Sequence, residues 1–152
     1  MLSPKCHLNV RKARCRRAAT GRVLGDIVSR PFIDFALLAR ATDQSRAFSA
    51  GQVIFNVGDE GTEFFVVKSG KVAVRLGNRT LDMLGEGEIF GEMALIDGEP
   101  RSATVVAETD CVVVPVSEKL FLFMTAEAPY FALSMMRVLV DRLRTANSAL
   151  PE

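Results

Sequence analysis

One short segment combines residue types that could bind a phosphate beside a sugar. It runs from Phe90 to Thr104 and reads Phe-Gly-Glu-Met-Ala-Leu-Ile-Asp-Gly-Glu-Pro-Arg-Ser-Ala-Thr. Arg101 offers a planar, charged fork of N–H donors that suits a phosphate, and Ser102 adds a hydroxyl donor. Glu92, which only accepts hydrogen bonds when it is ionised, suits a sugar hydroxyl. The segment therefore predicts a ligand that carries a phosphate next to a ribose.

Turn residues inside the segment could bring its charged groups together. Gly91 allows close backbone approach, and Met93–Ile96 fits one helical turn, whose unpaired N–H groups attract anions. Gly98 and the following Glu-Pro then reverse the chain, so that Arg101 returns toward the start of that turn. These residues alone leave plainer interpretations open. Arg101 could be a strand residue with a surface partner, and Glu92 a carboxylate stabilised by the helix dipole.

The chain around the segment alternates short apolar runs with turn residues, which is typical of small β-domains. Valine dominates these runs and favours strands. We therefore predict a mainly β fold, a small antiparallel β-barrel or jelly roll with flanking helices. The expected strands are Gln52–Val57, Glu63–Lys68, Lys71–Leu76, Thr80–Leu84, Arg101–Glu108 and Cys111–Ser117.

Helical patterns flank the expected strands on both sides. Val23–Ala47 reads as helix, interrupted at Arg30-Pro31 because the residue before a proline avoids the α region. Beyond Ser117 the chain again reads as helix, and Pro129 can start its last part. An apolar stripe in that part has to be buried against some other surface, and it consists of Ala132, Met135, Met136, Leu139 and Leu143.

Charge divides the chain of 152 residues into two parts. The first 25 residues hold seven of the 19 basic residues and none of the 18 acidic ones. We therefore expect a basic, disordered tail over residues 1–22 and one domain over residues 23–152. The remainder has 12 basic and 18 acidic residues, and such an acidic body is a poor surface for DNA.

The three cysteines, Cys6, Cys15 and Cys111, show no disulfide framework, which favours a reducing, cytoplasmic location. Cys6, His7 and Cys15 could be imagined as metal ligands, but a closed zinc site needs four, so we predict no metal site. No apolar run approaches the roughly 18 residues of a membrane-spanning helix, so no transmembrane segment is expected.

The segment resembles the phosphate-binding cassette of the cyclic nucleotide-binding domain family. That family includes protein kinase A regulatory subunits, cyclic nucleotide-gated channels and bacterial catabolite activators. The resemblance rests on Phe90–Ile96 and Pro100–Val105, and it extends to Gly51–Asp59 and Phe65–Val72, which are similar to early strands and turns of the family. It covers about residues 23–147.

The resemblance implies a role for each cassette residue. Glu92 would hold the ribose 2′-hydroxyl and Arg101 the cyclic phosphate. Serine rather than threonine after the arginine favours cAMP over cGMP. The final helix would cover the base as a lid. The remaining implied contacts are backbone from Gly91, Met93 and Ala94, phosphate contacts from Ser102 and Ala103, and lid candidates Leu139, Arg142 and Leu143.

We therefore expect a cyclic nucleotide sensor that acts on an unidentified effector protein through movement of its C-terminal helix, needs no cofactor, and could be an oligomer. The alternative is a scaffold of the same fold that binds no nucleotide. An enzyme is not expected, because His7 is the sole histidine and the cassette lacks a nucleophile–base pair. Direct DNA binding is not expected either, because no helix-turn-helix follows the last helix.

Overall fold

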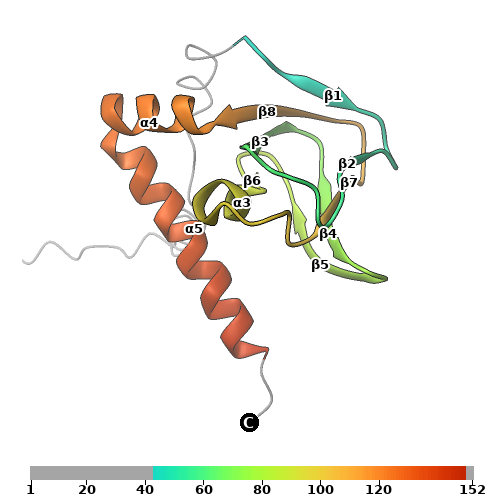
Figure 1. The fold of residues 1–152 in the computed structure, drawn as a ribbon. Coiled ribbons are helices and arrows are strands. Elements are labelled where there is room, and N and C mark those ends of the chain that lie inside the picture. The colour runs from blue at the N-terminus through green and yellow to red at the C-terminus, as the bar shows by residue number, and fades with distance from the viewer. Residues whose placement is uncertain (1–42, 150–152) are drawn as a thin grey trace, which may run out of the picture.

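The computed structural model describes residues 43–149, which form two β-sheets and three helices (Figure 1). In chain order the elements are β1 (Arg46–Phe48), β2 (Val53–Phe55), β3 (Glu63–Ser69), β4 (Val72–Leu76), β5 (Arg79–Leu84), β6 (Ile89–Phe90), α3 (Glu92–Asp97), β7 (Thr104–Ala107), β8 (Cys111–Ser117), α4 (Glu118–Glu127) and α5 (Pro129–Ser148).

The strands form two antiparallel sheets of four strands each. One sheet has the order β1-β8-β3-β6, and the other has the order β2-β7-β4-β5. The chain passes repeatedly from one sheet to the other, as in a jelly roll. The mainly β prediction is thus confirmed, as a sandwich rather than a closed barrel.

Strand β3 lies at the centre and is buried on both faces. Phe65 and Val67 face the other sheet, whereas Phe64 and Val66 pack toward α4 and α5. Side chains on a strand alternate between its faces, so a strand that is covered on both sides needs a continuous apolar run. This explains why Phe-Phe-Val-Val stands unbroken in the middle of β3.

Helix α3 follows β6 directly and packs against β3. The pairing of Phe90 with Phe65 and of Ile89 with Val66 fixes where β6 ends. Gly91 then adopts φ 76°, a left-handed conformation that glycine tolerates without a Cβ clash, and α3 begins at the next residue. Figure 1 shows α3 between the sheets and α5.

Helices α4 and α5 cover the outer face of the β3 sheet. The Ser117 side chain accepts a hydrogen bond from Leu120 N, and it thereby caps α4. Helix α5 begins at Pro129 and buries Phe131 and Met135 against the core, with Val138 partly buried beside them.

The expected apolar stripe on α5 is only partly buried within the described residues. Met135 is buried, but Met136 and Leu143 are exposed. The stripe straddled two faces of the helix, because Phe131 turns a different side toward the sheet.

The expected first helix also needs correction at its end. Ala47 lies in β1, where it pairs with Val112 of β8. Residues 43–45 of the expected helix are not helical either, and its earlier part and the basic tail lie outside the described residues. Among residues 43–149, no helix has the length and apolar character that a membrane crossing requires.

Candidate functional site: a buried arginine and a buried glutamate beside α3

The backbone of Arg101 is tied to the loop between β2 and β3. Its N–H donates to the carbonyl of Asp59 (2.8 Å), and its carbonyl accepts from the N–H of Gly58 (2.8 Å). This pair of bonds brings the chain back from α3, so that the Arg101 side chain enters the interior. Arg101 is only 5% exposed.

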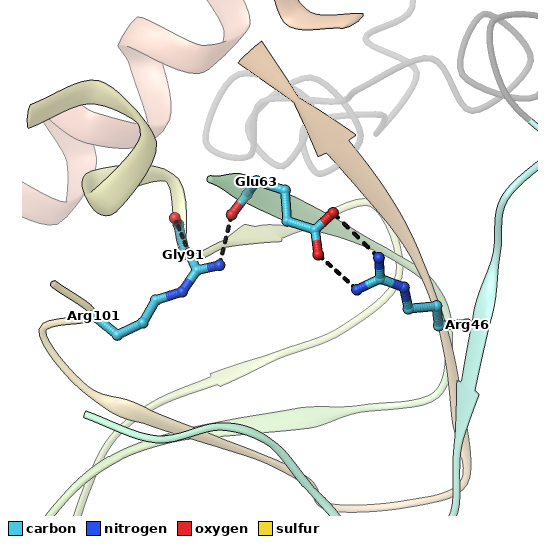
Figure 2. Close-up of polar contacts among 4 residues, drawn as sticks. All are labelled: Arg46, Glu63, Gly91 and Arg101. Atoms are coloured by element: carbon cyan, nitrogen blue, oxygen red, sulfur yellow. Dashed lines mark hydrogen bonds and ion pairs between the residues drawn. The ribbon is translucent and has the colours of Figure 1, made fainter. Parts of the chain in front are cut away.

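The guanidinium group of Arg101 donates to two backbone carbonyls (Figure 2). Nη1 lies 2.7 Å from the oxygen of Gly91, and Nη2 lies 2.8 Å from the oxygen of Glu63. The ring of Phe55 lies against the guanidinium, with its centroid 4.2 Å from Cζ, which adds a cation–π contact. These contacts hold the guanidinium in one orientation.

The carboxylate of Glu63 is engaged elsewhere. It accepts from Arg46 at 2.6 Å and 3.3 Å, and Figure 2 shows it turned toward Arg46. The two hydrogen bonds of the Arg101 guanidinium therefore go to neutral acceptors.

Burial leaves the positive charge of Arg101 only partly compensated. Desolvation lowers the pKa of Arg101 from its ordinary value, and the charges of Glu63, Asp59 and Glu92 oppose that shift. Its Nε is buried and has no hydrogen-bond partner within residues 43–149. A buried cation with a spare donor is well suited to bind an anion.

Two glycines make room for this arrangement. A Cβ on Gly61 would lie 2.6 Å from both Cζ and Nε of Arg101, and 2.8 Å from the Cβ of Ala94. A Cβ on Gly91 would lie 2.7 Å from Nη1 of Arg101. All of these distances are shorter than real Cβ contacts, so larger residues at Gly61 or Gly91 would displace the guanidinium of Arg101.

Glu92 is the second buried charged residue of the site, and it is 1% exposed. Its Oε1 forms an ion pair with Nη1 of Arg142, which projects from α5. Nη2 of Arg142 donates to the carbonyl of Ile89 at 2.5 Å. Glu92 Oε2 is buried and has no hydrogen-bond partner among the described residues, so it can accept one from a ligand.

The structure brings most of the predicted cassette residues together around α3. Ala94 and Ala103 are buried, whereas Met93 and Ser102 are exposed, with Ser102 Oγ 3.7 Å from the sulfur of Met93.

Of the three lid candidates, Arg142 is the one that the described residues show in contact with the cassette, through its ion pair with Glu92. Leu139 is half-buried and Leu143 is exposed.

Sequence reasoning missed the supporting residues Phe55, Gly61 and Glu63. In the sequence, Gly61 carries only the signal of a turn residue between two strands. Glu63 acts through its backbone carbonyl, which leaves no signal in the residue type.

Residues 45–127 match the family described as "Cyclic nucleotide-binding domain". The chain is 38% identical over 115 residues to the cyclic AMP receptor protein of Thermus thermophilus, an alignment that covers 72% of this chain and 53% of that protein. It is 45% identical over 73 residues to a cGMP-dependent protein kinase of Toxoplasma gondii, covering 48% of this chain and 7% of the kinase.

Among solved structures, the fold is similar to the catabolite activator protein of Thermus thermophilus. The TM-score is 0.66 at 36% sequence identity, and the match covers 74% of this chain and 55% of that one. The chain thus spans about half the length of the receptor protein and a small part of the kinase.

Proposed function

The chain belongs to the cyclic nucleotide-binding domain family, and on that premise we propose that it is a cyclic nucleotide sensor whose phosphate site is Arg101 and whose ribose site is Glu92. The observation that carries the proposal is that the two buried charged residues beside α3 each keep a buried atom without a hydrogen-bond partner among residues 43–149, Arg101 Nε and Glu92 Oε2. One is a donor on a cation and the other an acceptor on a carboxylate. A phosphate and a neighbouring hydroxyl are the groups that would satisfy both.

The relatives include one protein named for cyclic AMP and one named for cyclic GMP, so they do not decide which nucleotide this chain prefers. We favour cAMP because Ser102, rather than threonine, follows the arginine. Ser102 is exposed, and among residues 43–149 its hydroxyl is hydrogen-bonded to the weak acceptor sulfur of Met93, so it can turn toward a phosphate.

The ion pair between Glu92 and Arg142 suggests how ligand binding in the cassette would affect the contact of α5 with the cassette. Arg142 holds one oxygen of the carboxylate, and a ribose hydroxyl would use the other. A ligand that hydrogen-bonds to the Glu92 carboxylate must therefore share this carboxylate with Arg142 or displace the Arg142 guanidinium. If the ligand displaces Arg142, the contact between α5 and the cassette is lost, and α5 would then be the element that signals to an effector protein.

Titration calorimetry with cAMP and with cGMP tests the proposal on the full chain. We expect binding of both, with cAMP binding more tightly. Tighter binding of cGMP would refute the ligand choice. Absence of binding by both would favour the alternative of a scaffold that binds no nucleotide.

A matched pair of variants tests the site. Arg101→Gln should weaken cAMP binding by at least about tenfold, since a hydrogen bond to a charged group contributes about 1.5–3 kcal/mol. Arg75→Gln is the control, because Arg75 forms an ion pair with Glu108 at a partly exposed position on β4. Equal affinity of a folded Arg101→Gln variant and the control would remove Arg101 from the site.

A further inference from the structure

Two arginines lie near one aromatic ring at the start of β3. Cζ of Arg101 lies 5.8 Å from the ring centroid of Phe65, and Cζ of Arg46 lies 5.6 Å from the same centroid. Glu63 stands two residues before Phe65 on β3, and side chains two residues apart on a strand point to the same face. The Glu63 side chain therefore points to the face on which both guanidinium groups lie, and Figure 2 shows Glu63 between the two arginines.

Glu63 could act on Arg101 in two opposite ways. Its backbone carbonyl accepts from Nη2 of Arg101 at 2.8 Å, which orients the guanidinium without neutralising its charge. Its carboxylate could instead pair with that guanidinium, and it would then compete with a phosphate for the same cation. The two charges already interact at their present separation. Burial lowers the pKa of Arg101, and Glu63 opposes this lowering more strongly than Asp59 or Glu92 does.

Arg46 keeps the Glu63 carboxylate engaged on the other side. Nη1 of Arg46 lies 2.6 Å from Oε1 of Glu63 and Nη2 lies 3.3 Å from Oε2, so both carboxylate oxygens are bound in a fork-to-fork pair. The backbone of Arg46 is fixed by the pairing of β1 with β8, where it lies opposite Val113. The ion pair is partly exposed, with 47% of the Arg46 side chain and 26% of the Glu63 side chain accessible. Such a pair adds little to folding stability, so its removal should leave the domain folded.

We propose that Arg46 is a positioning residue of the phosphate site, which holds the Glu63 carboxylate away from Arg101 and so keeps the Arg101 guanidinium open to a phosphate. This role rests on the proposed function of Arg101. Without Arg46, the Glu63 carboxylate turns to Arg101, whose bond to the Glu63 carbonyl already holds the two residues together. A nucleotide then binds only the fraction of molecules in which that ion pair is open, and its apparent Kd rises accordingly.

A cycle of variants, measured by calorimetry with cAMP on the full chain, tests this role. Arg46→Gln should raise the Kd by at least about fivefold, because it frees the carboxylate to compete for Arg101. The same substitution made together with Glu63→Gln should change the Kd by less than about twofold relative to Glu63→Gln alone, because no carboxylate is left to compete. Arg75→Gln is the control. It breaks an ion pair with Glu108 that is similarly exposed, and it should leave the Kd unchanged.

A second measurement needs no nucleotide. In proton–nitrogen correlation spectra of the free protein, Arg46→Gln should move the Nε–H signal of Arg101, which is identified by its loss in Arg101→Gln. Adding Arg46→Gln to Glu63→Gln should leave that signal in place. A residue that merely supported the strands would move the signal equally in both backgrounds.

The two measurements separate the role of Arg46 from the proposed function. If the unmodified chain binds no cyclic nucleotide while the Arg101 signal moves as expected, the proposed function fails and the competition of Arg46 and Arg101 for Glu63 is supported. If the unmodified chain binds cAMP and Arg46→Gln binds it equally well, Arg46 has no positioning role. An equal loss of affinity with and without the Glu63 carboxylate, or an Arg101 signal that Arg46→Gln leaves unmoved, would also overturn the proposal.

Discussion

Substituting Gly61 by alanine should weaken nucleotide binding although Gly61 is not itself a predicted ligand contact. The added Cβ would lie 2.6 Å from Cζ and Nε of Arg101 and 2.8 Å from the Cβ of Ala94. Arg101 has a long, flexible side chain and can move, whereas Ala94 is fixed on α3. The guanidinium should therefore leave its bonds to the carbonyls of Gly91 and Glu63.

The magnitude follows from what the displaced guanidinium loses. Overpacking of a well-filled site costs about 1–3 kcal/mol of folding stability, so the melting temperature should fall while the domain stays folded. Loss of an oriented, charge-assisted contact to the phosphate costs about 1.5–3 kcal/mol of binding free energy. The Kd for cAMP should then rise by a factor of about 10 to about 150.

Calorimetry on Gly61→Ala and on Gly85→Ala measures this effect against a matched control. Gly85 also lacks a positive φ, and a Cβ there would meet its nearest atom, Glu88 Oε2, at 3.8 Å, an ordinary contact. Gly85→Ala should bind as the unmodified chain does. If the two variants bind cAMP equally well, the packing of Gly61 against Arg101 does not control the phosphate site, and the reasoning fails.

The other predictions concern the ribose site and α5. The 2′-deoxy analogue of cAMP should bind at least about tenfold more weakly than cAMP, because it leaves Glu92 Oε2 without a partner, and equal affinities in calorimetry would exclude Glu92 from the site. Bound cAMP should slow hydrogen exchange of the backbone amides of residues 135–144, read by mass spectrometry, and identical exchange with and without ligand would make α5 a fixed scaffold. Ending the chain after Val138 should weaken cAMP binding without unfolding the sheets, as circular dichroism would report, because it keeps Phe131, Met135 and Val138 on the core and removes Arg142 from Glu92.

Sequence reasoning anticipated the β-sandwich well because the relevant signals are local. Strand β8 was predicted with its observed bounds, Cys111–Ser117, since turn residues precede it and a helix cap ends it. The apolar run in β3 likewise predicted a buried strand. The short strands β1 and β6 were missed, because three or two residues carry too little pattern and form strands only through their pairing partners.

The sequence by itself predicted Glu92 and Arg101 as the charged pair of the candidate site, because their types suit a hydroxyl and a phosphate. Only the tertiary structure decided which atoms hold them. The Arg101 guanidinium donates hydrogen bonds to the backbone carbonyls of Gly91 and Glu63. Because every residue has a backbone carbonyl, the residue type does not predict such a contact. The ion pair between Glu92 and Arg142 joins residues on α3 and α5 that are remote in sequence.

The orientation of α5 was decided in the same way. Its apolar residues cover much of the helix circumference, so periodicity alone is compatible with more than one buried face. The tertiary structure packs the side with Phe131 and Met135 on the sheet and leaves Met136 and Leu143 outside. The physical reason is that a helix periodicity specifies directions around an axis, whereas burial depends on where neighbouring elements lie, which only the assembled fold provides.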